Sequence, residues 1–422
     1  MPGAAASFAP ENFSGQLPSL LIIAAVISTG RTNCGQFNWK WRGFSQGREL
    51  ALMLLVITRS TNKTRNMGLP FFTNGTRKKR DQMIAMDLGS RITKAVHLQR
   101  KGNGFALCGF ALLDAPIFEK NLSAELFAEH LKAVTQLLEA KTKLVSLTVG
   151  VNDALVRHVE MPPMPADEMR SILKLNSRVY LQQDLPNHIF DCDMAAFQVA
   201  DKKDGKTSNG GGKQKILIAG AKKQLVEDFL TGTKAAGLTA DFIVPGAIAP
   251  VNAFELALPE VFAKETVALV DIGFKSSSIS ILREGELALS RVVSIGGDRL
   301  TTGLSEVLNV SYTEAEGIKV GMAHEVESAL ESLLIPLGRE LRASLDFFEH
   351  QHDRPVGRVY LSGGSARSEF VVQTLQRELA VECRLWNPAA NLQLALSPKQ
   401  EAEIEQVASQ LTGAIGAALT AL

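Results

Sequence analysis

Short apolar runs alternate with polar turns and with helix-period segments from residue 83 onward. Met83-Ile-Ala-Met86 is an apolar run that stops at Asp87, and residues 93–99 and 105–112 have the composition of two further strands. Lys101-Gly-Asn-Gly104 separates those two strands and is typical of a hairpin turn. Apolar residues then recur at helical spacing over 124–140, and residues 144–149 return to the strand pattern. These elements predict an α/β unit that begins near Met83.

The same order of elements recurs in the second half of the chain. Val267-Ala-Leu-Val270 runs into Asp271-Ile-Gly273, a strand is predicted over 277–282, and Arg283-Glu-Gly-Glu286 is the next hairpin turn. Two copies of strand, Asp-x-Gly loop, strand, hairpin and strand form an internal duplication with a long period. The pattern therefore predicts an α/β fold of two related lobes.

Residues 151–246 lie between the two copies and do not belong to the repeat. They contain Met161-Pro-Pro-Met-Pro165, a predicted helix over 166–180, and a charged stretch over 201–215 that is typical of an exposed hairpin tip. We therefore expect four regions. They are an N-terminal extension over 1–82, the core of the first lobe over 83–150, an inserted α+β subdomain over 151–246, and a second lobe over 247–422 that ends in a packed helix.

Charge separates the N-terminal region from the rest of the chain. The whole chain has a net charge of +1, but residues 1–80 carry eleven Lys/Arg against two Asp/Glu. These basic residues are dispersed except for Arg77-Lys-Lys-Arg80, so we expect no nucleic-acid partner. Residues 1–66 show no sustained periodicity, and we interpret them as a disordered extension or as a stretch that precedes the native start at Met67.

Composition excludes several classes of site and protein. The 422 residues suggest two or three domains of a globular protein. Its four cysteines lie far apart and without His at metal spacing, so we expect unpaired thiols. The apolar runs 20–27 and 50–57 have eight residues each, which is short of the roughly 20 that a membrane-spanning helix needs.

The first Asp-x-Gly loop offers groups that bind phosphate and metal. Asp87 follows a strand, so its carboxylate can hold Mg²⁺, usually through water. Gly89 lets the backbone approach a phosphate, whose oxygens successive N–H groups of the turn can bind. Ser90 adds a hydroxyl, and Lys94 can bring a positive charge to the β- and γ-phosphates.

The second loop repeats this set with Asp271, Gly273, Lys275 and Ser276, and Ser277 is a further polar candidate. One Asp-x-Gly loop is usually an ordinary turn. Two such loops, each after an apolar strand, predict a cleft that holds a phosphate chain from both sides. Both aspartates are candidate metal ligands.

Three further features fit a nucleotide cleft. Gly296 and Gly297 precede a predicted helix whose N-terminus would favour an anion. Glu316 and Lys319 share a helix face and could bind ribose hydroxyls, or could form a surface ion pair. The strand Arg358-Val-Tyr-Leu361 is followed by the segment Ser362-Gly-Gly364. Its glycines Gly363 and Gly364 would let the backbone approach adenine closely.

The order of these motifs resembles the superfamily that contains actin and the sugar kinases. A closer resemblance is to the PilM family of type IV pilus assembly proteins, and it covers about 67–422. Its distinctive part is Glu160-Met-Pro-Pro-Met-Pro-Ala-Asp-Glu-Met-Arg170, followed by Tyr180 and Asp184-Leu-Pro186. The ending Thr412-Gly-Ala-Ile-Gly-Ala-Ala-Leu419 and the beginning Met67-Gly-Leu-Pro-Phe-Phe72 are similar to the family as well.

The resemblance implies a cytoplasmic protein, peripheral to the inner membrane, that binds ATP with Mg²⁺. Its implied partner is the short N-terminal peptide of an inner-membrane PilN-type protein, docked broadly within 151–246, and self-association is compatible with the family. We find no unambiguous residue to orient or deprotonate a hydrolytic water, so we expect nucleotide to act mainly as a conformational ligand, with at most slow hydrolysis.

Three alternatives share the motifs. A division protein of the FtsA type would normally end in a membrane-targeting amphipathic helix, whereas residues 407–422 are apolar without a basic face. A small-molecule kinase would need a substrate pocket and a catalytic base. The cytoplasmic component of a type II secretion system would continue into a transmembrane helix.

Overall fold

The computed structural model describes residues 80–116, 123–193 and 214–422. The expected extension up to residue 79, with the proposed start Met67, and the glycine run 210–212 lie outside these ranges. Within these ranges the structure contains three β-sheets and the helices that cover them.

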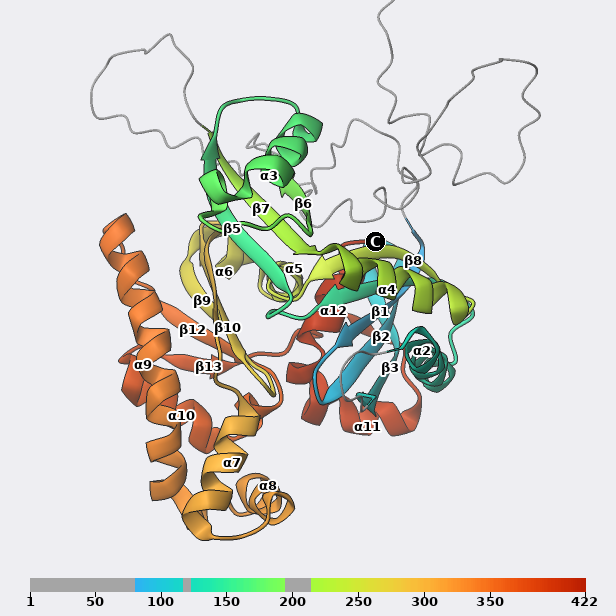
Figure 1. Cartoon of the computed structure of the whole chain (residues 1–422). Helices are drawn as coiled ribbons and strands as arrows, with labels where there is room; N and C mark the ends of the chain where they lie inside the picture. Colours follow the sequence, from blue (N-terminus) through green and yellow to red (C-terminus); the bar gives the residue numbers. More distant parts are fainter. Residues whose placement is uncertain (1–79, 117–122, 194–213) are drawn as a thin grey trace, which may run out of the picture. The chain divides into compact units, whose positions relative to one another are not determined.

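Six strands form the first sheet, in the order β14-β3-β2-β1-β4-β8 (Figure 1). β1, β2 and β3 are an antiparallel meander, and β4 and β8 then continue from β1 in parallel. The run Met83–Met86 is completely buried, as expected of a central strand covered on both faces. The strands are β1 (Gln82–Leu88), β2 (Ile92–Lys101), β3 (Gly104–Asp114), β4 (Leu144–Val149), β8 (Thr239–Pro245) and β14 (Gln393–Leu394).

The second sheet repeats this plan with five strands in the order β11-β10-β9-β12-β13. β9, β10 and β11 form the antiparallel meander, while β12 and β13 run parallel to β9. The duplication expected from the two Asp-x-Gly loops is therefore present in the strand order. The strands are β9 (Thr266–Ile272), β10 (Ser277–Arg283), β11 (Glu286–Val293), β12 (Arg358–Ser362) and β13 (Cys383–Leu385).

A third, smaller sheet follows β4 in the chain and has the order β5-β7-β6. One face packs against α3 through Met161, Met169 and Leu173. This sheet lies within the range 151–246 expected for the insert, but β8, which lies within the same range, belongs to the first sheet. The elements are β5 (Ala154–Met161), α3 (Ala166–Leu181), β6 (His188–Asp193) and β7 (Gln214–Lys222).

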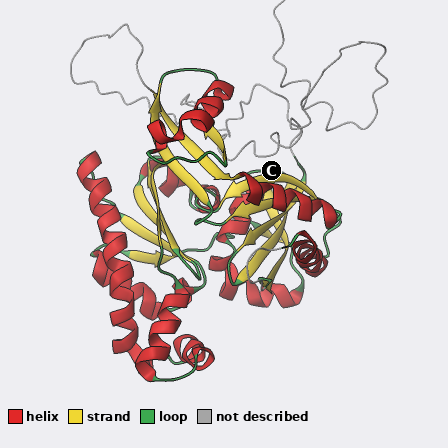
Figure 2. Ribbon diagram, viewed as in Figure 1, coloured by secondary structure: helices red, strands yellow, loops and turns green. Residues whose placement is uncertain are grey.

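Helices cover the two large sheets (Figure 2). α2 and α4 bury the face of the first sheet that contains Ile84 and Met86, and α9 and α10 pack on the second sheet. The helices are α2 (Ala124–Leu138), α4 (Lys223–Ala235), α5 (Ala249–Ala257), α6 (Pro259–Lys264), α7 (Gly297–Leu308), α8 (Tyr312–Gly321), α9 (Glu327–His352), α10 (Glu369–Leu379), α11 (Pro398–Val407) and α12 (Thr412–Leu419), with three-residue to four-residue 3₁₀ turns at Ala323–Val326, Ser365–Arg367 and Ala408–Gln410.

The C-terminal segment returns to the first sheet. β14 pairs with β3, and α12 packs against β1 and α5. Gly416 makes the α12–α5 contact possible, because a Cβ there would lie 1.7 Å from the carbonyl oxygen of Ala249. The core beneath α12 and α5 contains Met83 from the first sheet and Val267 from the second. The two large sheets therefore share a hydrophobic core.

Candidate functional site

Asp87 lies near the end of β1, and neighbouring strands bind both oxygens of its carboxylate. Thr148 of β4 donates its hydroxyl to Oδ1 at 2.8 Å, and Lys94 of β2 donates to Oδ2 at 3.2 Å. Thr148 is fully buried and also accepts the N–H of Leu88. The side chain is therefore oriented by the register of two strands rather than by the loop alone.

Asp271 has the corresponding place near the end of β9. Ser362 of the parallel strand β12 donates its hydroxyl to Oδ1 of Asp271 at 2.8 Å, as Thr148 does for Asp87. Burial raises the pKa of Asp271, and the nearby Asp87 charge acts in the same direction, while Lys94 and Ser362 oppose the shift. The second carboxylate is thus less well compensated than the first.

Lys94 interacts electrostatically with both aspartates. Burial lowers its pKa, but attraction to Asp87 and then to Asp271 outweighs this, so the pKa of Lys94 is raised overall. In the β1–β2 ladder Lys94 pairs with Asp87, whereas in the β9–β10 ladder Ser278 pairs with Asp271. The duplicated site therefore has a lysine at the position in the first half where the second half has a serine.

Glycine is required where the loops pack closely. A Cβ on Gly89 would lie 2.4 Å from the oxygen of Ile92 and 2.8 Å from Nζ of Lys94, and one on Gly273 would lie 2.7 Å from the oxygen of Ser276. Gly363 has φ +94° and packs against the backbone of Ile272. These three glycines bring backbone close to backbone at the ends of β1, β9 and β12.

The N-terminus of α7 lies against the second loop. Gly297 and Asp298 donate their N–H groups to the carbonyl oxygens of Gly273 and Phe274, both at 2.9 Å. A Cβ on Gly296 would collide with these same two oxygens. These first amides are used within the protein, so the glycines at 296 and 297 join the helix to the loop.

Glu316 and Lys319 lie on α8, which begins with a capping box between Ser311 and Glu314. Lys319 donates to Oε2 of Glu316 at 2.6 Å, and both side chains are more than four-fifths buried. Thr301 of α7 donates to the same carboxylate. This pair is a partly buried network at the α7–α8 contact rather than a solvated surface pair.

Arg91 connects this network to the first loop. Its guanidinium donates to Oε1 of Glu316 at 2.7 Å and lies 5.2 Å from the ring centroid of Phe274. Arg91 belongs to the turn between β1 and β2, while Phe274 and Glu316 belong to the second half of the chain. One side chain thus contacts the loops of both halves.

The remaining predicted residues lie at the edges of this arrangement. Ser90 and Gly364 are exposed. Lys275 is exposed too and forms an ion pair with Asp298 of α7 at 2.7 Å. Ser276 is buried and accepts a hydrogen bond from Asn152, whereas Ser277 donates to the carbonyl of Ile295. Lys275 is therefore not the counterpart of Lys94.

Sequence reasoning missed several residues that the structure brings to the loops. Thr148 and Asn152 come from the end of β4 and the turn after it, and Gly413 comes from α12, where a Cβ would lie 2.9 Å from Cγ of Asp87. In each half, the strand that neighbours the Asp-x-Gly strand has a hydroxyl residue at its carboxyl end. This repeated feature of the sequence could have indicated a partner for each aspartate. The approach of Gly413 had none, because it depends on where α12 packs.

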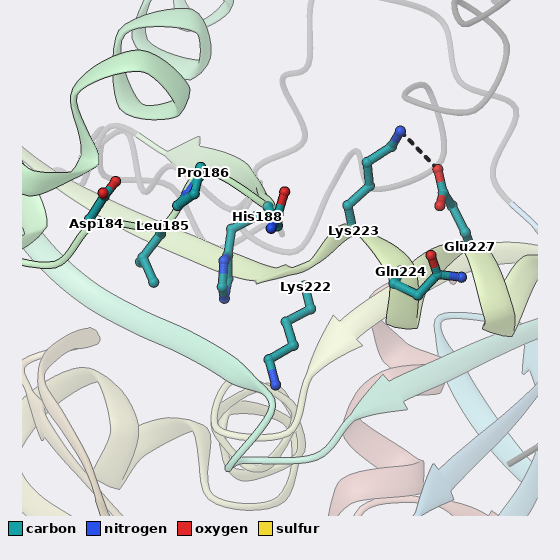
Figure 3. A pocket seen from close by; sticks show the side chains of 9 residues that line it. Asp184, Leu185, Pro186, His188, Lys222, Lys223, Gln224 and Glu227 are labelled. Carbon is teal, nitrogen blue, oxygen red and sulfur yellow. Dashed lines mark ion pairs between the residues drawn. The ribbon is translucent and has the colours of Figure 1, made fainter. Parts of the chain in front are cut away.

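A groove lies between the third sheet and α4 (Figure 3). Its volume is about 630 Å³, and apolar Leu185 and Pro186 line it together with charged residues. His188 and Lys222 are paired across β6 and β7, and Figure 3 shows their side chains on the same side of the strands. Lys223 faces the other way and forms an ion pair with Glu227 at 3.0 Å.

The donor set at the two aspartates fits a hydrated divalent cation. Asp87 and Asp271 are oxygen ligands of the kind that Mg²⁺ prefers, and Mg²⁺ usually needs one or two protein carboxylates. Within the described ranges, no group of three or more His, Cys, Asp or Glu side chains could hold a metal ion by itself. Two carboxylates leave most positions of an octahedral Mg²⁺ shell to water and to phosphate oxygens.

No helix in the described part of the chain has the length and apolar character needed to cross a membrane.

Two solved structures superpose on this chain. The "PilM-PilN type IV pilus biogenesis complex" superposes with a TM-score of 0.69 at 21% identity, over 80% of this chain and 97% of that chain. The ethanolamine utilization protein EutJ from Carboxydothermus hydrogenoformans has a TM-score of 0.47 at 14% identity, over 80% of this chain and 89% of its own. The first of these structures confirms the actin-like fold expected from the sequence.

A cell division protein is similar over a shorter stretch. FtsA of Bacillus subtilis (strain 168) is 32% identical over 108 residues, which are 26% of this chain and 24% of FtsA. The match thus spans about a quarter of that protein's length. The family model described as "Type IV pilus assembly protein PilM" matches residues 85–422, most of the chain. The chain belongs to the PilM family of type IV pilus assembly proteins.

Proposed function

We propose that this protein is a cytoplasmic, ATP-binding scaffold of type IV pilus assembly, held at the inner membrane by the N-terminal peptide of a PilN-type protein. The observation that carries the nucleotide part is the pair of partly buried aspartates from duplicated loops, with Lys94 attracted to both. Two acids and one cation in such a place suit a ligand that brings both Mg²⁺ and phosphate.

Each residue has a defined task in this proposal. Asp87 and Asp271 hold the hydrated metal, oriented by Thr148 and Ser362. Bound Mg²⁺ supplies positive charge that neutralises the phosphates. Lys94 then interacts less strongly with the carboxylates and binds the β- and γ-phosphates.

The loops and the second half complete the nucleotide site. Ser90 and Ser276 offer hydroxyls to the phosphate groups, and Gly89 and Gly273 keep the two loops free of side chains beside them. Glu316 and Lys319 face the ribose, and the close-packed turn at 363–364 faces the base. Because no residue is assigned to activate water, nucleotide acts as a conformational ligand that biases the partner surface.

The groove of Figure 3 is the proposed docking site of the PilN-type peptide. Family membership supports the occupant, and the groove lies in the region assigned to partner docking. It lies at the start of β6, whose first residue His188 lines it. Because β6 is an edge strand of the third sheet, an extended peptide can gain main-chain hydrogen bonds there. Leu185 and Pro186 provide apolar contacts beside that strand.

Calorimetry with Mg-ATP tests the nucleotide site. The wild-type protein should bind, and Asp271→Asn should weaken binding at least tenfold. Asp228→Asn on the exposed side of α4 is the matched control and should bind like wild type. Equal affinity of all three proteins would remove Asp271 from the site.

Calorimetry with a synthetic PilN-type N-terminal peptide, with and without Mg-ATP, tests the partner. Absence of binding in both states would leave an actin-like nucleotide binder without this partner. Phosphate release is measured in parallel, and robust turnover that Asp271→Ala abolishes would replace the scaffold by an ATPase.

A further inference from the structure

A hydrogen bond joins the turn after β4 to the second Asp-x-Gly loop. Nδ2 of Asn152 donates to Oγ of Ser276 at 3.0 Å. Asn152 lies in the turn between β4 and β5, and β5 is the first strand of the third sheet. Ser276 directly precedes β10. The bond therefore connects the root of the third sheet to a proposed phosphate loop.

Ser276 can serve two partners at once. It is 7% exposed, and its carbonyl oxygen accepts the N–H of Gly273, which closes the loop. A hydroxyl has one hydrogen to donate and two lone pairs to accept. Since Ser276 accepts from Asn152, its own hydrogen remains available to an oxygen of a ligand in the loop.

Asn152 is likewise tied to the groove. The turn that contains it is closed by Asp153 and Ala154, which donate their N–H groups to the carbonyl of Gly150. β5 begins at Ala154, whose partner in β7 is Ala221. The next residue of β7 is Lys222, which lines the groove. A shift of Asn152 therefore moves the start of β5 and the strand beside it.

A second cavity, of about 470 Å³, lies along this route. Asn152 lines it together with Ser290, Arg291 and Val292 of β11, so both halves of the chain contribute to its wall. Leu185, His188 and Lys222 line this cavity and the groove alike. The second Asp-x-Gly loop and the groove are thus connected by residues that are in direct contact or that pair with one another in neighbouring strands.

We infer that the Asn152–Ser276 hydrogen bond couples the nucleotide site to the peptide groove, with Asn152 as the positioning residue. The inference rests on the proposed function. When Ser276 donates to a phosphate oxygen, its oxygen becomes a better acceptor for Asn152, since hydrogen bonds in a chain strengthen one another. Nucleotide therefore fixes the turn that carries β5, and Mg-ATP and the peptide each raise the affinity for the other, by the same factor.

A thermodynamic cycle tests the coupling. The affinity for the synthetic PilN-type N-terminal peptide is measured by calorimetry with and without Mg-ATP, in wild type, Asn152→Ala and Asn152→Leu. One neutral hydrogen bond corresponds to a coupling of about two- to tenfold. Mg-ATP should change the peptide affinity by this factor in wild type and by a factor near one in both variants. Each ligand alone should bind both variants within about threefold of its affinity for wild type. Asn103→Ala, in the exposed β2–β3 turn, is the matched control and should keep the coupling.

Hydrogen exchange of the full chain provides a readout that does not depend on peptide affinity. Mg-ATP should slow exchange at residues 150–155 in wild type and not in Asn152→Leu. Undiminished coupling in both Asn152 variants, or equal exchange with and without Mg-ATP in wild type, would overturn the inference and leave the proposed function intact. Lack of peptide or ATP binding by wild type would overturn both.

Discussion

The ammonium nitrogen of Lys94 lies 3.2 Å from Oδ2 of Asp87, its partner across the β1–β2 ladder. This contact distinguishes the two aspartates of the duplicated site. Asp87 has a direct cationic partner, whereas Asp271 is partly buried beside Ser362 and interacts with Lys94 less directly. Substitutions at the two positions should therefore have different effects on the nucleotide-free protein.

Asp87→Asn should destabilise the nucleotide-free protein, because it leaves Lys94 without its bonded carboxylate. A hydrogen bond to a charged group contributes about 1.5–3 kcal/mol. Asp271→Asn should be neutral or stabilising, because it removes a partly buried charge whose carboxyl pKa is raised by desolvation, and it keeps an acceptor for Ser362. Urea denaturation of both variants provides the comparison. Equal destabilisation by the two would refute the proposed asymmetry.

Thr148→Val should weaken Mg-ATP binding through Asp87, because Thr148 orients Asp87 and does not itself contact the ligand. The substitution keeps the shape of the buried side chain and removes the donor to Asp87 and the acceptor for the N–H of Leu88. The loss should reduce stability by about 1–3 kcal/mol, because a buried partner remains unsatisfied. Thr135→Val, at a half-buried position of α2, is a control for the chemical change. Unchanged urea midpoint and ATP affinity in Thr148→Val would count against its orienting role.

Gly416→Ala should disrupt the contact between α12 and α5. Its Cβ would lie 1.7 Å from the oxygen of Ala249 and 2.4 Å from the carbonyl carbon, so backbone must move. Overpacking of this kind costs about 1–3 kcal/mol. Gly317→Ala on α8 has no atom within 4 Å of the new Cβ and should instead stabilise by about 0.5–1 kcal/mol. Thermal denaturation should give shifts of opposite sign.

Cys383 should be protected from thiol reagents in the folded protein. Burial, with a smaller contribution from Glu382, raises the pKa of its thiol to about 12 from an ordinary value of 9.0. The folded state therefore retains this proton more tightly, so the stability that it contributes is lost as pH rises from 9 through 12. Mass spectrometry after labelling at pH 8 should show slow modification at Cys383 in native protein and fast modification in urea. Equal rates in both states would contradict the prediction.

Much of the architecture could be predicted from the sequence, because the relevant signals are local. Apolar runs that end in Asp-x-Gly predicted β1 and β9, and the strand-hairpin pattern that follows each predicted the two meanders. The helix over 124–140 and the strand over 144–149 agree with α2 and β4 within two residues. Antiparallel strands joined by short turns are consecutive in the chain, so their order in the sequence indicates which strands are neighbours in the sheet.

The sequence by itself determined the duplicated strands, the paired aspartates and the family resemblance. The tertiary structure decided which groups meet these aspartates. Thr148 and Ser362 reach them from parallel strands that arrive after long crossovers, and Gly413 reaches Asp87 because α12 returns to the first sheet. It also decided that Lys94 faces both acids and that Lys275 turns to Asp298. These contacts depend on register and helix packing between segments far apart in the chain, which no local pattern of residues specifies.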